Sequence, residues 1–245
     1  GLEVTLIEKH ETLGGVCLNV GCIPSKALLH VAEVINEADN HEKMGLSCGK
    51  MTKDISKIKA FKAQTVNKLT GGLAMLAKKR KVTVLQGQAQ FVSDTQLSVH
   101  TQEGEVALTF SSCIIATGSR PVALPFLPKD PRIVNSTGAL DLAITQGRML
   151  IIGGGIIGCE MATVYNALGM EVHVVEMTEQ IMPGADIDLV KPCQKMMEKR
   201  GVRFHLNTKV ESAKAEKKGI TVSFSGNDAL KKAETFDLVL ESVGR

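Results

Sequence analysis

The feature that most constrains the fold is a strand that runs into a glycine-rich turn and then into a helix. The apolar strand 149–152 is followed by Gly-Gly-Gly-Ile-Ile-Gly at 153–158, and helical sequence comes next. In such a turn Gly153 allows the sharp bend, Gly155 lets a phosphate approach the backbone, and Gly158 lets the helix pack closely. The helix N-terminus adds free N–H groups and a positive dipole end. The segment therefore predicts a site for a nucleotide pyrophosphate.

Glu176 indicates which dinucleotide this site takes. It ends the next expected strand, where a carboxylate can bind the hydroxyls of the adenosine ribose. The same carboxylate repels a 2′-phosphate, and no Arg occurs in 177–183 to accept one. We therefore expect NAD(H) and not NADP(H).

A repeat in the sequence predicts a second unit of the same kind. Residues 1–8 align without gaps with residues 169–176, and both segments end in a glutamate. Further on, 115–118 corresponds to 241–244, and each is expected to be a closing strand with a terminal glycine. Two matches in the same order favour two copies of one dinucleotide-binding unit.

Glu8 then has the role in the first copy that Glu176 has in the second. The alternative for Glu8 is an ordinary solvated carboxylate at a strand end. The glycine-rich turn of the first copy would precede Gly1, so we expect the chain to lack it.

Strand and helix signals alternate along the chain, as in α/β proteins with parallel sheets. We expect helices at about 24–40 and 54–79, and a meander of short strands across 82–110. We also expect a buried strand at 113–117. Four prolines within 120–132 indicate a connector between domains.

Two of the six cysteines, Cys17 and Cys22, lie close together at the start of the first of these helices. The other four are scattered, so neither a disulfide framework nor a metal site is expected. In a reducing compartment, a close pair is more often catalytic than structural. The helix dipole favours a Cys22 thiolate, and Lys26, one turn later, adds positive charge. This arrangement suits reversible thiol–disulfide exchange, with a structural staple as the alternative.

The segment Gly-Gly-Val-Cys-Leu-Asn-Val-Gly-Cys-Ile-Pro-Ser-Lys, at 14–26, resembles the signature of a class of flavoprotein disulfide oxidoreductases. The class contains dihydrolipoamide dehydrogenase, glutathione reductase and mercuric reductase. The resemblance covers essentially the whole chain, and 18–26 has the form found in bacterial-type dihydrolipoamide dehydrogenases. Glutathione reductases typically have another basic residue at Ser25 and an NADP-type pocket at Glu176.

The resemblance implies oxidation of dihydrolipoamide to lipoamide with NAD as acceptor, within 2-oxo-acid dehydrogenase complexes. Electrons would pass from the substrate to the cysteine pair, then to FAD, then to NAD. Cys17 would be the interchange thiol and Cys22 the thiolate against the flavin. Lys26 would lie near the flavin's reactive edge, paired with Glu160, which otherwise looks like an ordinary helix carboxylate.

The expected cofactor-binding residues fall into two groups. Those of the first unit are Glu8, Gly14, Gly15, Lys26, Ala89, Thr117 and Gly118. Those of the second unit are Gly153, Gly155, Ile156, Ile157, Gly158, Glu176, Val210 and Gly244.

The implied fold class is α/β, with two Rossmann-like dinucleotide-binding domains and a small β-meander in the first. We expect 1–146 to be the FAD domain, without its first strand and GxGxxG turn, and 147–245 to be the NAD domain. The family's interface domain and its catalytic His–Glu pair are expected outside this chain. His100 and Glu105 have the spacing of that pair but fall within the meander. We therefore expect the chain alone to be inactive with dihydrolipoamide.

The resemblance also implies a homodimer and, as partner, the dihydrolipoyl group of an acyltransferase subunit. A net charge of +3 with dispersed Lys and Arg favours neither nucleic acid nor a membrane surface. No uninterrupted apolar run is long enough to span a bilayer. The expected location is the cytoplasm, or the mitochondrial matrix in a eukaryote. The alternatives are a mercuric or other NAD(P)H-dependent disulfide reductase, or a non-catalytic NAD-binding redox sensor.

Overall fold

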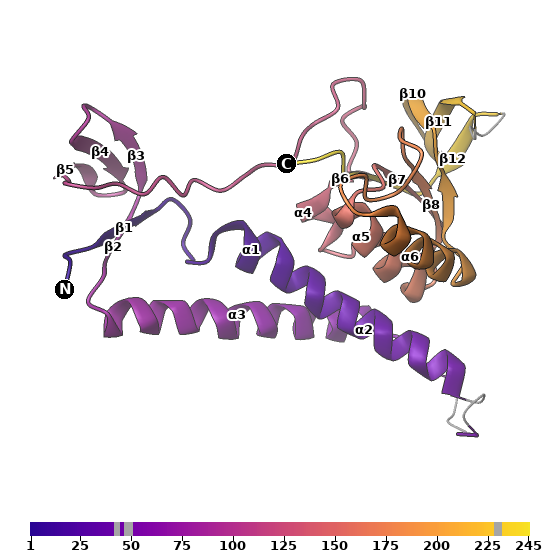
Figure 1. Ribbon diagram of the computed structural model, residues 1–245, viewed down its shortest axis with the longest axis horizontal. Helices are drawn as coiled ribbons and strands as arrows, with labels where there is room; N and C mark the ends of the chain where they lie inside the picture. Colours follow the sequence, from indigo (N-terminus) through magenta and orange to yellow (C-terminus); the bar gives the residue numbers. More distant parts are fainter. Residues whose placement is uncertain (42–44, 47–50, 228–231) are drawn as a thin grey trace. The chain divides into compact units, whose positions relative to one another are not determined.

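A computed structural model describes residues 1–41, 45–46, 51–227 and 232–245 (Figure 1). It has an α/β fold with both parallel and antiparallel sheets. The chain divides into two compact units, and each unit is built from two separate stretches. Unit 1 comprises Gly1–Ile23 and Ala63–Ser119, and unit 2 comprises Pro24–Lys62 and Arg120–Arg245. The assignment of 1–146 and 147–245 to two cofactor domains remains a prediction.

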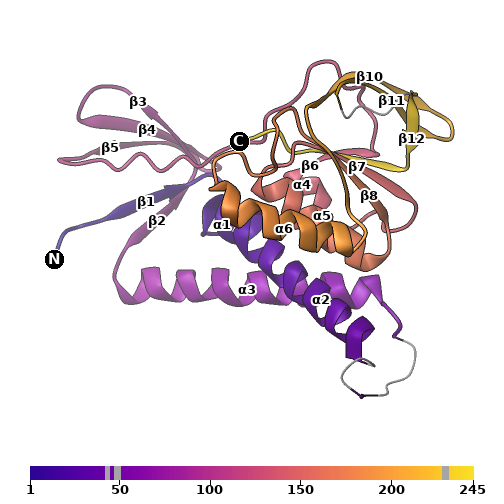
Figure 2. The same ribbon diagram turned by 45° about the vertical axis from the view of Figure 1, so that its right-hand side comes forward.

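Unit 1 contains two small sheets. Strands β1 (Thr5–Glu8) and β2 (Thr83–Gln86) pair in parallel. Strands β3 (Gln88–Phe91), β4 (Gln96–Thr101) and β5 (Gly104–Thr109) form the antiparallel meander, side by side in both views (Figures 1 and 2). The predicted meander is confirmed, except that β2 belongs to the parallel pair.

The meander also contains the histidine and glutamate that have the spacing of a catalytic pair. His100 and Glu105 face each other across β4 and β5. Glu105 accepts a hydrogen bond from the hydroxyl of Ser98.

One predicted strand is wrong. Residues 113–117 are irregular, and Ile114 and Ile115 are 91% and 69% exposed. A β-strand needs neighbours for its N–H and C=O groups, and among the described residues no strand pairs with this segment. The two closing strands predicted from the repeat also differ from expectation: 115–118 is not a strand, and β13 (Leu238–Glu241) ends where 241–244 begins.

Three helices carry the predicted periodicity. Helix α2 (Cys22–Asn40) and helix α3 (Ile55–Lys79) confirm the expected helices to within two residues. A short helix α1 (Gly15–Val20) precedes α2 and was not predicted. Helix α5 (Ile156–Leu168) begins in the glycine-rich turn, as expected.

The stretch Gly15–Ala38 is long and apolar enough to cross a membrane. This is weak evidence for a membrane location, because a core helix of a soluble protein has the same composition. One face of α2 is buried in the protein as in a core helix: Leu28, Ala32 and Ile35 are at most 4% exposed and pack in the core of unit 2.

Unit 2 is built on a five-stranded parallel sheet in the order β6-β13-β7-β8-β9. Besides β13, its strands are β6 (Ile133–Asn135), β7 (Arg148–Ile152), β8 (Glu171–Val175) and β9 (Arg203–His205). The remaining elements are helices α4 (Ser136–Ala139) and α6 (Ile187–Lys199) and the antiparallel strands β10 (Thr208–Glu216), β11 (Gly219–Gly226) and β12 (Glu234–Phe236).

Alternate residues of β7 face the two sides of this sheet. Met149 and Ile151 pack with the helical core, which includes residues of α5 and α6. Leu150 and Ile152 pack with residues of β10, β11 and β12. Because both faces are covered, residues 149–152 of the strand are all apolar. The chain proceeds from β7 to β8 and β9 on one side, whereas β13 lies on the other. The strand order therefore reverses beside β7, at the position where open α/β sheets bind ligands.

Candidate functional site

The glycine-rich turn follows β7 at this reversal point. Gly153 has a φ of 104°, and a Cβ there would lie 2.6 Å from the carbonyl oxygen of Ser242, just after β13. A Cβ on Gly158 would lie 2.1 Å from the carbonyl oxygen of Gly153, whereas a Cβ on Gly155 would meet no atom within 4 Å. The three glycines thus provide the bend, the close helix packing and the open approach that a pyrophosphate needs.

The first turn of α5 is available to an anion. Gly155 is the N-cap residue, and no side chain caps the helix there. Ile156 is exposed and Ile157 is half-buried, so both lie at the accessible start of the helix. The N-terminal N–H groups and the helix dipole suit a pyrophosphate.

The carboxylate of Glu176 lies against this turn. Its Oε2 accepts the N–H of Gly154 at 2.8 Å. Its Oε1 accepts the N–H of Thr178 at 2.9 Å and the Thr178 hydroxyl at 3.0 Å. The backbone and Thr178 therefore fix the carboxylate beside the predicted pyrophosphate site, which is the position a ribose-binding group requires. The sequence did not indicate the role of Thr178.

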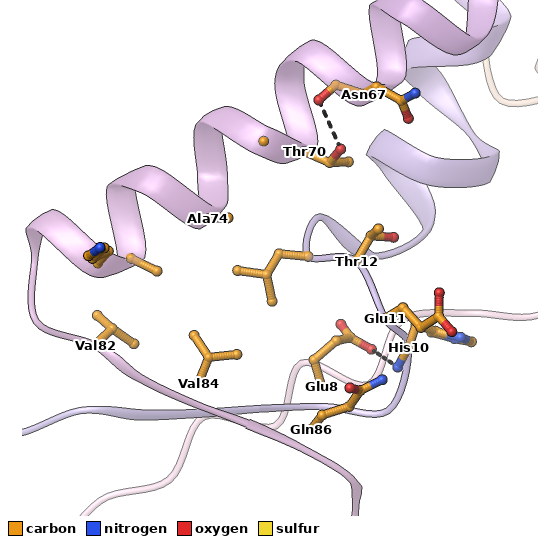
Figure 3. A pocket seen from close by; sticks show the side chains of 14 residues that line it. Glu8, His10, Glu11, Thr12, Asn67, Thr70, Ala74, Val82, Val84 and Gln86 are labelled. Atoms are coloured by element: carbon orange, nitrogen blue, oxygen red, sulfur yellow. Dashed lines mark hydrogen bonds between the residues drawn. The ribbon is translucent and has the colours of Figure 1, made fainter.

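Glu8 has the same local geometry in unit 1. Its Oε1 accepts the N–H of His10, two residues later, at 3.0 Å, as Glu176 does with Thr178. This correspondence supports the sequence repeat. Glu8 also lines a cavity of about 710 Å³ between α3 on one side and β2 with the end of β1 on the other. Glu8 and Gln86 stand on one side of it, and Asn67, Thr70 and Ala74 of α3 on the other (Figure 3).

The cysteine pair lies where α1 gives way to α2. Cys17 is on α1, and Cys22 is the first residue of α2, so the predicted position at a helix N-terminus is confirmed. The side chains of Cys17 and Cys22 are both exposed. Gly21 separates the two helices. A Cβ at this position would lie 2.8 Å from the Val16 carbonyl oxygen, so the site favours glycine. Gly14 and Gly15, with φ of 112° and 57°, start α1.

Cys159 differs from these two thiols. It is 6% exposed on α5, and its Sγ donates to the Gly154 carbonyl oxygen at 3.3 Å. Burial raises the pKa of the Cys159 thiol to about 12. Because the thiolate is the reactive form, Cys159 is a packing residue at neutral pH.

Within unit 2, an ion pair joins α2, the helix that begins at Cys22, to α5, the helix that follows the glycine-rich turn. The Nζ of Lys26 donates to Oε1 of Glu160, which lies in the second turn of α5. The hydroxyl of Ser25 donates to Oε2 of the same carboxylate at 2.6 Å. The structure therefore brings together Lys26 and Glu160, which only the family resemblance had linked. Sequence reasoning did not find the contact of Ser25.

The remaining predicted residues of unit 1 are accessible. Ala89 is exposed on β3, and Thr117 and Gly118 are exposed in the irregular segment. Gly118 has a φ of 74°, and a Cβ there would lie 3.5 Å from the Val16 side chain. Gly118 thus lies beside the helix that carries Cys17.

In unit 2, Val210 and Gly244 have different environments. Val210 is 4% exposed and packs in the core beneath β10, so its side chain is not available to a ligand. Strand β10 nevertheless begins beside Glu176, whose carbonyl accepts the N–H of Thr208 at 2.9 Å. Gly244 has a φ of 133° and lies beyond the carboxyl end of β13. No group of three or more potential metal-ligand side chains occurs among the described residues.

Known proteins resemble this chain over its full length. A dihydrolipoyl dehydrogenase of Vibrio cholerae is 49% identical over 246 residues, and one of Haemophilus influenzae is 50% identical over 247. The match covers all of this chain but 52% and 51% of those proteins. A Cu(II) complex of the HOCl-induced flavoprotein disulfide reductase RclA from Escherichia coli has a TM-score of 0.82 at 28% identity, over all of this chain and 51% of that one.

The chain thus spans about half the length of the curated relatives it matches. All of its residues, 1–245, match the family described as pyridine nucleotide-disulphide oxidoreductase. With the relatives, this match shows that the chain belongs to the pyridine nucleotide-disulphide oxidoreductase family.

Proposed function

We propose that this chain supplies the redox-active cysteine pair and the FAD- and NAD-binding residues of a dihydrolipoamide dehydrogenase. The observation that carries the proposal is the link between α2 and α5. The helix that begins at Cys22 is joined, through Lys26 and Glu160, to the helix that begins at the glycine turn. The names and identities of the relatives from Vibrio and Haemophilus support the same function.

Cys17 and Cys22 carry out the thiol–disulfide step in this proposal. In the oxidised state they form a disulfide, and a thiolate of dihydrolipoamide attacks the Cys17 sulfur. The Cys17–Cys22 bond breaks, a mixed disulfide forms, and Cys22 leaves as the thiolate at the positive end of α2. The second substrate thiol loses its proton to the His–Glu pair that we expect outside this chain, and it attacks the substrate sulfur of the mixed disulfide. The bond from that sulfur to Cys17 breaks, and Cys17 leaves as a thiolate. Lipoamide leaves, and both cysteines are reduced.

The two cofactor sites follow from the geometry of the strand ends. Glu176 binds the adenosine ribose of NAD, and the N-terminus of α5 binds its pyrophosphate. Glu8, at the end of β1 and beside the cavity between α3 and β2, binds the adenosine ribose of FAD. When bound, FAD carries two electrons from the cysteine pair to the nicotinamide. Lys26 would supply positive charge near the flavin's reactive edge, and Glu160 holds that ammonium.

The wider assignments also belong to this proposal. Residues 1–146 contribute to the FAD domain and 147–245 to the NAD domain, each of Rossmann type. The whole protein is a cytoplasmic homodimer that accepts the dihydrolipoyl group of an acyltransferase subunit. Because the catalytic His–Glu pair is not assigned to this chain, we expect no turnover of dihydrolipoamide by residues 1–245 alone.

The decisive measurement is the visible absorption spectrum of the native protein during anaerobic addition of dihydrolipoamide. We expect a flavin spectrum that develops a long-wavelength band from thiolate contact with the flavin. Cys22→Ser should abolish the band, whereas Cys113→Ser, which changes an exposed cysteine outside the pair, should retain it. A protein without flavin, or a flavin that does not respond to the dithiol, would refute the proposal.

A further inference from the structure

We infer that Ser25 is a positioning residue that orients Glu160 and thereby holds the ammonium group of Lys26 in place. Ser25 is 5% exposed, and its hydroxyl donates to Oε2 of Glu160 at 2.6 Å. Lys26 donates to the other oxygen, Oε1. Two consecutive residues of α2 thus bind the two oxygens of one carboxylate on α5.

The ion pair by itself does not fix the carboxylate. The side chain of Lys26 is 61% exposed, and an ion pair with such an exposed partner is weak and easily exchanged with water. The Glu160 side chain is only 17% exposed, so its second oxygen needs a partner inside the protein. A short hydrogen bond from a hydroxyl to a carboxylate is charge-assisted and directional. The bond from Ser25 therefore determines which oxygen faces Lys26.

Removal of the hydroxyl leaves Oε2 without this bond. Every buried side-chain nitrogen and oxygen of the described residues has a hydrogen-bond partner. A carboxylate that loses such a partner rotates or draws in water, because an unpaired buried acceptor is unfavourable. In either case Oε1 shifts relative to Lys26, and the ammonium spends more time in solvent.

The consequence for catalysis rests on the proposed function, in which Lys26 lies at the reactive edge of the flavin. The orienting role itself does not depend on that function, because all three side chains belong to unit 2 of the chain. The two ideas are therefore tested by different signals.

The test is residue-specific acetylation of lysines in the native protein by a small amine-reactive reagent, quantified by peptide mass spectrometry. Labelling of Lys26 is measured against Lys191, an exposed lysine elsewhere in unit 2. We expect Ser25→Ala to raise the labelling rate of Lys26 by about threefold, which is the scale of a typical net hydrogen-bond contribution, because the effect reaches Lys26 only through Glu160. Ser25→Thr keeps a hydroxyl and should restore the original rate.

Two controls separate orientation from general loosening. Thr163→Ala removes a partly buried hydroxyl from α5 that donates to the Cys159 carbonyl, and it should leave Lys26 unchanged. Lys53 donates to the Ala167 carbonyl at 2.7 Å, and it reports loosening within the same molecule. Unchanged labelling of Lys26 in Ser25→Ala, or equal increases at Lys26 and Lys53, would overturn the inference.

If Ser25→Ala does not fold, Ser25→Cys serves in its place, because it keeps the side-chain size but donates more weakly. It should give a smaller increase at Lys26, and the same negative results apply. A flavin band without the labelling response would refute the role of Ser25 alone. The labelling response without the flavin band would refute the proposed function alone.

Discussion

Glycine serves two distinct physical needs at Gly155 and Gly158. A Cβ on Gly155 would meet open space, and the residue has a φ of −68°, which any amino acid adopts. A Cβ on Gly158 would collide with a backbone carbonyl at 2.1 Å. The first glycine therefore keeps room for a ligand, whereas the second allows the helix to pack on the turn.

This contrast predicts opposite effects of two alanine substitutions. Gly155→Ala should leave the melting temperature within about 2 °C and weaken NAD binding at least tenfold, because the methyl group occupies the pyrophosphate approach. Gly158→Ala should cost about 2–4 kcal/mol of stability, because backbone must move. Thermal unfolding and fluorescence titration with NADH measure the two effects. Equal loss of stability in both variants would contradict the assignment.

The second prediction at the residue scale concerns the carboxylate of Glu176 and the affinity for NADH. Glu176→Gln should weaken NADH binding by about tenfold, because a charge-assisted bond to the ribose becomes a neutral one. The preference for NADH over NADPH should also fall, because the repulsion of a 2′-phosphate is lost. Glu179→Gln changes an exposed carboxylate three residues later and is the matched control. If the NADH/NADPH affinity ratio does not change, Glu176 does not select the cofactor.

At the scale of elements, strands β7, β8 and β9 carry a cluster of charged, partly exposed side chains around a buried histidine. His173 is 2% exposed. Its Nδ1 lies 3.0 Å from Nε2 of the stacked His205, and its Nε2 lies 3.0 Å from Oε1 of Glu171. Arg148 and Arg203 approach the same ring, and Phe236 of β12 packs on it edge-on. Burial, assisted by the two arginines, lowers the pKa of His173 from its ordinary 6.5.

The cluster predicts how stability changes with pH. Below about pH 6.5 the unfolded chain binds a proton at His173 that the folded chain resists, so the free energy of unfolding falls as the pH falls. The hydrogen bond with His173 is the main cause that lowers the pKa of Glu171 from its ordinary value of 4.5. The stability that Glu171 contributes is therefore lost only as the pH falls below about 4.5. His173→Gln should flatten the stability profile between pH 7 and pH 5, whereas exposed His100→Gln should not. Unfolding midpoints across this range test the prediction, and an unchanged slope in His173→Gln would contradict it.

Elements stabilised by residues nearby in the sequence were predicted well, whereas elements that depend on residues far away in the sequence were not. Helices α2, α3 and α5 follow from local periodicity and glycine placement, and they were predicted closely. The strand at 113–117 was wrong, because strand formation depends on distant neighbours that an apolar run does not reveal. The contact of Ser25 with Glu160 spans 135 positions. No local pattern predicts such a contact, although Glu176 beside the glycine turn followed from a known motif.

At the scale of the whole molecule, unit 2 depends on two separate stretches of chain. The stretch Pro24–Lys62 contributes core residues and three lysine contacts: Lys26 to Glu160, Lys53 to the Ala167 carbonyl, and Lys62 to the Leu140 carbonyl. The side chain of Lys62 is 15% exposed, and burial lowers its pKa. These contacts hold the two stretches together independently of the polypeptide link between them.

Limited proteolysis of residues 1–245 tests this organisation. Thermolysin cuts before exposed apolar residues, and Ile114 and Ile115 are the expected first sites. The products near 1–113 and 114–245 should elute together in size-exclusion chromatography, because unit 2 draws on both. Under denaturing electrophoresis they should separate. Elution as two separate species would show that unit 2 does not depend on its first stretch.

Unit 2 is formed by two stretches that are separate in the sequence, and this limits how a gene segment that encodes part of it can be recombined into another protein. A gene segment that encodes 147–245 lacks Leu28, Ala32 and Ile35, which pack in the core of unit 2, as well as Lys53, which donates to the Ala167 carbonyl. Recombination at residue 147 would transfer the glycine-rich turn without the α2 residues that cover the apolar core of unit 2, and that apolar surface would be exposed. We therefore expect the half of this chain that carries the glycine-rich turn to be inherited together with the helix that starts at Cys22, so that the two diversify as a pair.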